Sequence, residues 1–146
     1  MKHEIFHLGL LPQEQAKKRG SHTALRHRDD ATGQWVPTSW KKFAAEVDAL
    51  ACAMLANGVQ VQENMGVFTN NMPQGLCTDF AAFAIRAVTI PLYATSSETQ
   101  VQYIVNDAQI RFLFVGEQQQ YDTAFRVHSV CPSLEKLIIF DPKVVK

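Results

Sequence analysis

The stretch Asn64-Met-Gly-Val-Phe-Thr-Asn-Asn-Met-Pro73, followed by an apolar segment and then by Ala87-Val-Thr-Ile-Pro-Leu-Tyr93, decides the fold. The apolar run at 65–68 predicts a buried strand, and the polar asparagines after it predict a turn. Proline suits the first turn of a helix because it lacks the amide hydrogen that this position leaves unpaired. A second apolar run then predicts another strand. The stretch therefore predicts one strand–helix–strand unit.

The same unit recurs along the rest of the chain. Predicted strands are centred near Val67, Thr89, Leu113 and Ile138, between 22 and 25 residues apart, and segments of helical periodicity fill the gaps. The strands are continuous apolar runs, which is typical of strands covered on both faces. Strand–helix alternation predicts parallel strands joined by right-handed crossovers. We therefore expect an α/β fold with a doubly wound, mainly parallel sheet and helices on both faces.

The N-terminal third predicts a short β-hairpin and one long helix. Segments 23–28 and 35–38 flank an Asp- and Gly-containing turn, as in a hairpin. From about Ser39 to Asn57 apolar residues recur at helical spacing, with Ser39 or Thr38 as cap and Gly58 at the end. The expected buried stripe comprises Phe43, Val47, Leu50, Ala51, Met54 and Leu55.

Three further helices are predicted between the strands, and the third gap carries Tyr121, Ala124, Phe125 and His128. In the first, Leu76, Phe80, Phe83, Ala84 and Ala87 share the expected buried face. Ahead of the second, Thr95-Ser-Ser-Glu98 matches a capping box, in which a hydroxyl and a carboxylate satisfy the free amides of the helix start.

Composition limits the class of protein and its partners. The chain has 146 residues, 47% of them hydrophobic, with 14 basic and 14 acidic side chains, so no net field draws it to nucleic acid. The N-terminus does not read as a signal peptide, and no apolar run is long enough to span a bilayer. Three widely spaced cysteines, with Cys52 and Cys77 on expected buried helix faces, argue against disulfides or a zinc site. These features predict a cytoplasmic protein.

One motif suggests a metal but lacks the context for it. His3-Glu4-Ile-Phe-His7 matches H-E-x-x-H, which on a helix presents two imidazoles to zinc. The match begins at the third residue, and Gly9 and Pro12 follow closely, so little helix remains to hold the geometry. No third ligand is evident. We therefore predict an incidental amphipathic N-terminus and no metal site.

Glycine spacing argues against the common nucleotide-binding loops. No two of the seven glycines stand in a G-x-G-x-x-G pattern, and none precedes the Lys-Ser or Lys-Thr of a phosphate loop. A G-x-S-x-G nucleophile turn is missing too. An independent dinucleotide-binding, phosphate-loop or serine-nucleophile enzyme is not indicated.

The candidate site residues follow the predicted strands. Open α/β sheets bind ligands beyond the carboxyl ends of their strands, which here places Asn71, Tyr93 and Thr95 near a substrate. Asn70 and Asn71 also suit plain turn and helix-entry hydrogen bonding, and the Tyr93 ring also suits packing between layers. These positions offer no acid/base pair or nucleophile, so we predict no catalytic, cofactor-binding or metal-binding residue.

The order of several motifs resembles a known family. The chain carries Thr38-Ser-Trp40, Asn71-Met-Pro73, Pro91-Leu-Tyr-Ala-Thr-Ser96, Tyr103-Ile-Val-Asn-Asp-Ala108 and Phe112-Leu-Phe-Val-Gly116. Over roughly residues 20–142 this pattern is similar to the N-terminal part of adenylate-forming acyl-CoA synthetases, and most similar to long-chain fatty-acid–CoA ligases. Asn64 stands where the family often has Asp, and Arg86 where it often has Gly. Both lie at ends of elements, so they loosen the subfamily assignment more than the fold.

The resemblance implies a two-step reaction for the whole enzyme. ATP and a fatty acid form an acyl-adenylate and pyrophosphate, and coenzyme A then displaces AMP, with Mg²⁺ on the phosphates. The family's phosphate-binding loop and catalytic lysine lie beyond the matched segment. Residues 1–146 are therefore expected to form an N-terminal subdomain, truncated before that loop, that binds no cofactor and is inactive without the rest of the polypeptide.

Three other interpretations stay open. Within the family, the chain is compatible with an aryl-CoA ligase or an adenylation domain. Outside it, a non-enzymatic α/β interaction module, such as a homodimerisation surface, fits the same composition. For the full-length enzyme, peripheral attachment to a membrane also stays open.

Overall fold

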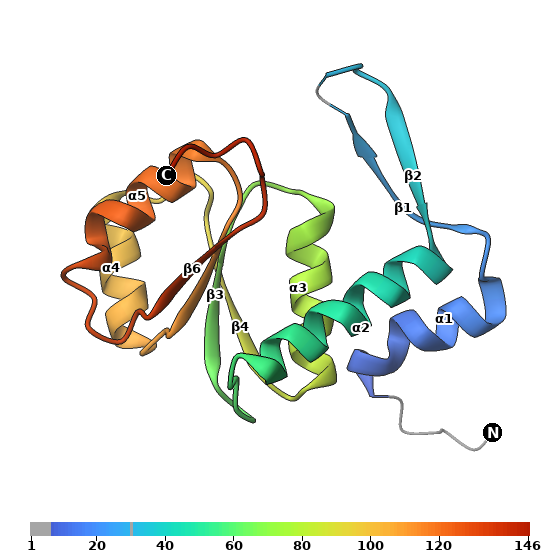
Figure 1. Cartoon of the computed structure of the whole chain (residues 1–146), viewed down its shortest axis with the longest axis horizontal. Coiled ribbons are helices and arrows are strands. Elements are labelled where there is room, and N and C mark those ends of the chain that lie inside the picture. The colour runs from blue at the N-terminus through green and yellow to red at the C-terminus, as the bar shows by residue number, and fades with distance from the viewer. Residues whose placement is uncertain (1–6, 30) are drawn as a thin grey trace. The chain divides into compact units, whose positions relative to one another are not determined.

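A computed structural model describes residues 7–29 and 31–146 (Figure 1). The chain divides into two compact units. The first contains the chain up to Val61 together with Leu76–Arg86, and the second contains Gln62–Gly75 and Ala87–Lys146. Helix α3 (Pro73–Ala84) begins in the second unit and continues into the first.

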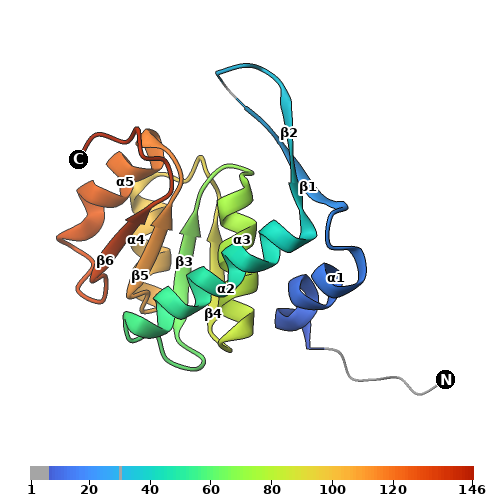
Figure 2. The same ribbon diagram turned by 45° about the vertical axis from the view of Figure 1, so that its right-hand side comes forward.

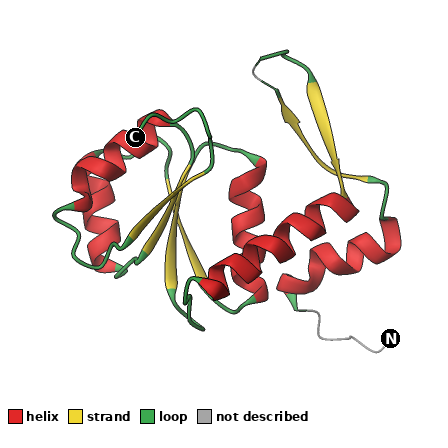
Figure 3. Cartoon of the chain, in the orientation of Figure 1, coloured by secondary structure: helices red, strands yellow, loops and turns green. Residues whose placement is uncertain are grey.

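The second unit is built on a four-stranded parallel sheet (Figure 3). Its strands are β3 (Asn64–Phe68), β4 (Val88–Leu92), β5 (Phe112–Val115) and β6 (Lys136–Ile139). The spatial order is β4-β3-β5-β6, so the chain first winds to one side of β3 and then reverses to the other. This reversal is the mark of a doubly wound sheet. The expected α/β class, sheet type and strand positions are confirmed.

Helices α4 (Glu98–Asp107) and α5 (Gln118–His128) lie against one face of this sheet (Figures 1 and 2). Their buried side chains join those of the strands in one core, formed by Phe68, Leu92, Val101, Val105, Ile110, Leu113, Val115, Tyr121, Ala124, Val127, Cys131 and Leu134. Strand β5 is buried at every residue, and β3 at all but its first. The edge strands β4 and β6 are partly exposed, because each has a hydrogen-bonded neighbour on one side only.

The first unit contains the predicted hairpin and long helix. After a short 3₁₀ turn, η1 (Leu8–Leu10), come α1 (Leu11–Arg19), β1 (Thr23–Arg28), β2 (Trp35–Ser39) and α2 (Trp40–Ala56). Strands β1 and β2 pair in antiparallel fashion. The Ser39 hydroxyl accepts a hydrogen bond from the Lys42 amide at 3.2 Å, which caps α2, and Gly58 adopts a left-handed φ of 82° just beyond its end. Both predicted signals of helix start and end are confirmed.

Some predicted helix faces are wrong in detail. Leu55 and Leu76 are 55% and 44% exposed, and Cys52 is exposed too. Helix α3 instead buries the small side chains of Cys77, Thr78, Ala81 and Ala82. Apolar periodicity identifies these helices, but the width and rotation of the buried stripe depend on which neighbours pack against it.

The capping box of α4 lies two residues further along than predicted. Ser97 donates its amide to the Gln100 side chain at 2.9 Å, and its hydroxyl accepts from the Gln100 amide at 3.4 Å. Thr95 and Ser96 stand before the cap, so Thr95 remains in the loop that follows β4.

Candidate functional site

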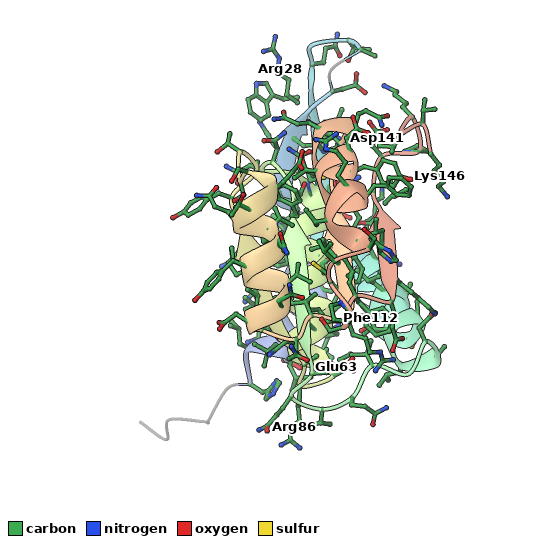
Figure 4. The ribbon with its side chains drawn as sticks, turned by 90° about the vertical axis from the view of Figure 1, so that its left-hand side faces the viewer. Arg28, Glu63, Arg86, Phe112, Asp141 and Lys146 are labelled. Atoms are coloured by element: carbon green, nitrogen blue, oxygen red, sulfur yellow. The ribbon has the colours of Figure 1, made fainter. Side chains whose placement is uncertain are left out.

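The carboxyl ends of the parallel strands lie at one edge of the sheet in the second unit. Phe68 pairs with Leu92 on one side and Val115 on the other, and Val115 pairs with Ile139. The segments that follow these residues therefore share this carboxyl edge. In Figure 4, Asp141 marks it, whereas Glu63 and Phe112 lie at the opposite, amino edge.

All three predicted substrate-proximal residues are in loops at the carboxyl edge. Asn71 follows β3, and Tyr93 and Thr95 follow β4. Each side chain is exposed, and no hydrogen bond joins the three to one another in the described part of the chain. The topology thus gathers them at one edge, and their contact with a substrate stays a prediction.

The alternative interpretation of Tyr93, a ring packed between layers, is wrong. The Tyr93 side chain is 85% exposed. The chain turns directly after the buried Leu92, with the Ser96 amide donating to the Tyr93 carbonyl at 2.8 Å. This turn leaves the ring outside the packed layers.

A chain of hydrogen bonds connects three of the loops at the carboxyl edge. After β3, the Asn70 side-chain amide donates to the Glu117 carboxylate at 2.7 Å. The Glu117 backbone amide donates to Gln120 Oε1 at 3.1 Å, and Gln120 Nε2 donates to the carbonyl of Ala94, after β4, at 3.0 Å. Sequence reasoning missed this link, although Glu117-x-x-Gln120 has the spacing of a capping box.

Two glycines let the loop after β3 approach its neighbours closely. A Cβ placed on Gly116 would lie 2.3 Å from Thr69 Oγ1 and 3.1 Å from Thr69 Cα. A Cβ on Gly75 would lie 3.0 Å from the Thr69 methyl carbon. Thr69 Oγ1 is buried and has no hydrogen-bond partner among the described residues. The end of β3 is therefore tightly packed, whereas the side chains beyond it are exposed.

The starts of α4 and α5 at this edge are capped from within the chain. In α4 the amides of Ser97 and Gln100 have side-chain acceptors, and at the start of α5 the Glu117 amide has one. Phosphate-binding loops instead present unpaired amides to the anion.

Two buried thiols are held in the neutral form. Burial raises the pKa of Cys77 to about 12, and the charge of Glu46 adds to the rise. Burial also raises the pKa of Cys131. Since the thiolate is the nucleophilic species, neither group suits nucleophilic catalysis near neutral pH.

The candidate metal motif is only partly described. His3 and Glu4 lie outside the described residues, and Nδ1 of His7 accepts a hydrogen bond from the Gly9 amide at 3.2 Å, capping η1. Within residues 7–29 and 31–146 no group of three or more His, Cys, Asp or Glu side chains could hold a metal ion. The helices in that part of the chain are also too short or too polar to cross a membrane.

Comparison with known proteins places the chain among enzymes. The model of the family "AMP-binding enzyme" matches residues 12–145. The long-chain-fatty-acid–CoA ligase FadD15 of Mycobacterium bovis is 26% identical over 106 residues, which cover 73% of this chain and 18% of that protein. Long-chain-fatty-acid–CoA ligase 1 of Cavia porcellus is 23% identical over 143 residues, covering 95% of this chain and 20% of that protein.

Solved structures share the fold. The anthranilate CoA ligase AuaEII, crystallised with anthranoyl-AMP, superposes with a TM-score of 0.83 at 18% identity, covering 92% of this chain and 25% of that one. The chain spans about a fifth of the length of the curated relatives that it matches. Fold, motif order and the match over residues 12–145 agree, and the chain belongs to the family of AMP-binding enzymes.

Proposed function

We propose that this chain is the N-terminal subdomain of an ATP-dependent long-chain fatty-acid–CoA ligase and ends before the phosphate-binding loop. The full-length enzyme would convert a fatty acid, ATP and CoA into acyl-CoA, AMP and pyrophosphate, with Mg²⁺ on the phosphates. The observation that carries the proposal is the family match over residues 12–145, together with curated relatives named as long-chain-fatty-acid–CoA ligases.

The chain would act as a scaffold for chemistry supplied by the rest of the same polypeptide. The described carboxyl edge offers the Asn71 amide, the Thr95 hydroxyl and the Tyr93 ring to a substrate. These groups can bind and orient a ligand, but amides, alcohols and phenols are weak acid/base catalysts at neutral pH. We therefore expect no ATP–pyrophosphate exchange by the chain alone.

A chimeric enzyme tests the scaffold role. The matched segment of M. bovis FadD15 is replaced by this chain, and acyl-CoA formation is measured with fatty acids of several lengths. We expect the chimera to form acyl-CoA, FadD15 lacking the segment to be inert, and the chain alone to show no exchange. A folded chimera that is inert with every fatty acid, or exchange by the chain alone, would contradict the proposal.

An aryl-CoA ligase is the second candidate, because the fold is shared with AuaEII at a TM-score of 0.83. The same replacement in AuaEII separates the two. Activity of the FadD15 chimera with an inert AuaEII chimera supports the fatty-acid assignment, and the reverse result supports the aryl one.

A further inference from the structure

We propose that Gln120 is a positioning residue, which holds the Tyr93–Thr95 loop in place and thereby sets the affinity for the substrate bound at the carboxyl edge. The second half of this proposal rests on the proposed function, because it takes the loop to be substrate-proximal. The first half, the ordering of the loop, stands on the contacts of the second unit alone.

Gln120 is a buried polar side chain with both ends paired. Its side chain is 1% exposed, although it lies in the first turn of α5, next to the exposed Gln118 and Gln119. Its Nε2 donates to the Ala94 carbonyl at 3.0 Å, and its Oε1 accepts from the Glu117 amide at 3.1 Å. Leaving either buried partner unpaired carries the full cost of removing that group from water, so both contacts resist opening.

The loop that Gln120 reaches has little packing of its own. Tyr93 is 85% exposed, and Thr95 is exposed as well, so neither side chain anchors the backbone in the core. Within the loop, one turn hydrogen bond runs from the Ser96 amide to the Tyr93 carbonyl. The bond from Gln120 to Ala94 fixes the middle of this turn to α5.

The same glutamine connects loops that follow different strands. The Ala94 loop follows β4 and Gln120 follows β5, and these strands are separated by β3 in the sheet. Gln120 also accepts a hydrogen bond from the backbone amide of Glu117. The carboxylate of Glu117 in turn accepts a hydrogen bond from Asn70, which follows β3. The contacts of Gln120 and Glu117 therefore reach across three neighbouring strands, two of which, β3 and β4, carry the candidate site residues in the loops that follow them.

Measurement of KM distinguishes a positioning role of Gln120 from a purely structural one, which would leave KM unchanged. The loop side chains lie at the edge of the sheet and offer binding groups rather than reactive ones. A change that loosens them removes binding shared by ground state and transition state, so it raises KM and leaves kcat little changed.

The first experiment measures amide hydrogen exchange in the 146-residue chain. Gln120→Met keeps the length of the side chain and removes both hydrogen bonds, whereas Gln120→Glu keeps the acceptor and removes the donor. We expect the Ser96 amide to exchange about tenfold faster or more in both variants, with the β5 amides unchanged. The matched controls Gln119→Met and Gln119→Glu alter an exposed neighbour and should leave Ser96 exchange unchanged.

The second experiment introduces Gln120→Met and Gln119→Met into the FadD15 chimera. We expect Gln120→Met to raise KM for at least one of ATP, CoA and fatty acid several-fold at nearly constant kcat, and Gln119→Met to change neither. Unchanged Ser96 exchange, exchange accelerated equally in β5, or an unchanged KM for all three substrates would each overturn the proposal. An inert wild-type chimera would count against the proposed function instead, and the exchange experiment would still decide the positioning of the loop.

Discussion

The two edges of the parallel sheet are held together by different chemistry. At the amino edge, Arg111 pairs with Glu63 at 2.8 Å and with Glu135 at 3.0 Å, and its guanidinium lies 4.5 Å from the centre of the Phe112 ring. At the carboxyl edge the strand ends are joined by a close glycine contact at Gly116 and by hydrogen bonds through Gln120. The amino edge is thus fixed by ion pairs around Arg111, whereas the carboxyl edge keeps the exposed side chains of Asn71, Tyr93 and Thr95.

The largest effect is expected from Gly116→Ala at the carboxyl edge. The added methyl carbon would meet Thr69, including its backbone Cα at 3.1 Å, and backbone cannot move aside as a side chain can. We expect a loss of about 2–3 kcal/mol in the free energy of unfolding, measured by urea titration.

Gly75→Ala is the matched control for Gly116→Ala. Its new carbon would meet side chains alone, the Thr69 methyl group at 3.0 Å and Val67 Cγ1 at 3.9 Å, and alanine favours the helix in which it lies. We expect its stability to stay within about 1 kcal/mol of wild type. Equal stability of the Gly116→Ala variant and wild type would show that the close approach does not fix this edge.

Arg111→Met tests the amino edge. The substitution removes the ion pair between Arg111 and Glu63, whose side chain is only 13% exposed. Breaking a fully buried pair costs about 3–5 kcal/mol, and with Arg111 itself 31% exposed we expect about 2 kcal/mol. The loss should shrink in high salt, because screening weakens the wild-type pair.

The exposed pair of Lys42 and Glu46, 3.8 Å apart, provides the control for Arg111→Met. Lys42→Met should change the free energy of unfolding by less than about 0.5 kcal/mol. If Arg111→Met and Lys42→Met lowered the free energy of unfolding by the same amount, the ion pairs at the amino edge would contribute no more than an exposed surface pair.

Asn64→Asp tests the hydrogen bond between the start of β3 and the end of α4 at the amino edge. The Asn64 side-chain amide donates to the Ala108 carbonyl at 2.8 Å, and an aspartate at this position would place an oxygen against that carbonyl. We expect a loss of about 1–1.5 kcal/mol at neutral pH, measured by urea titration. Asn57→Asp is the comparison, because it removes an exposed bond of the same kind, from the Asn57 amide to the Ala53 carbonyl at 2.8 Å. We expect a smaller loss there, and equal losses at the two positions would refute the specific role of Asn64.

The strands and helices were predictable because their signals are local. The apolar runs around Val67, Thr89, Leu113 and Ile138 gave all four strands of the sheet, and Ser39 and Gly58 gave the limits of α2. Apart from the position of the capping box of α4, the errors concern exposure. Leu55, Leu76 and Tyr93 are apolar or aromatic, yet their burial depends on what packs against them, and that information is not contained in the spacing of one helix or strand.

The carboxyl edge was predictable as a location but not as a network. The rule for open α/β sheets places Asn71, Tyr93 and Thr95 at this edge, as the topology has them. The link from Gln120 to Ala94 joins segments 26 residues apart, across an intervening strand. A capping pattern at Glu117 and Gln120 was visible in the sequence, but its extension to the loop after β4 requires the strand order.

The smallest effect is expected where the chain leaves α3 before β4. Arg86 has a left-handed φ of 63°, at the position where the family pattern often has glycine. This conformation costs a residue with a Cβ about 1–2 kcal/mol, and glycine recovers part of that while losing more entropy on folding. We expect Arg86→Gly to raise the free energy of unfolding by about 0.5–1 kcal/mol. Arg86→Ala removes the same charge and keeps the Cβ, so it should give no gain. Equal stability of the two variants would mean that charge, and not backbone conformation, sets the preference at this position.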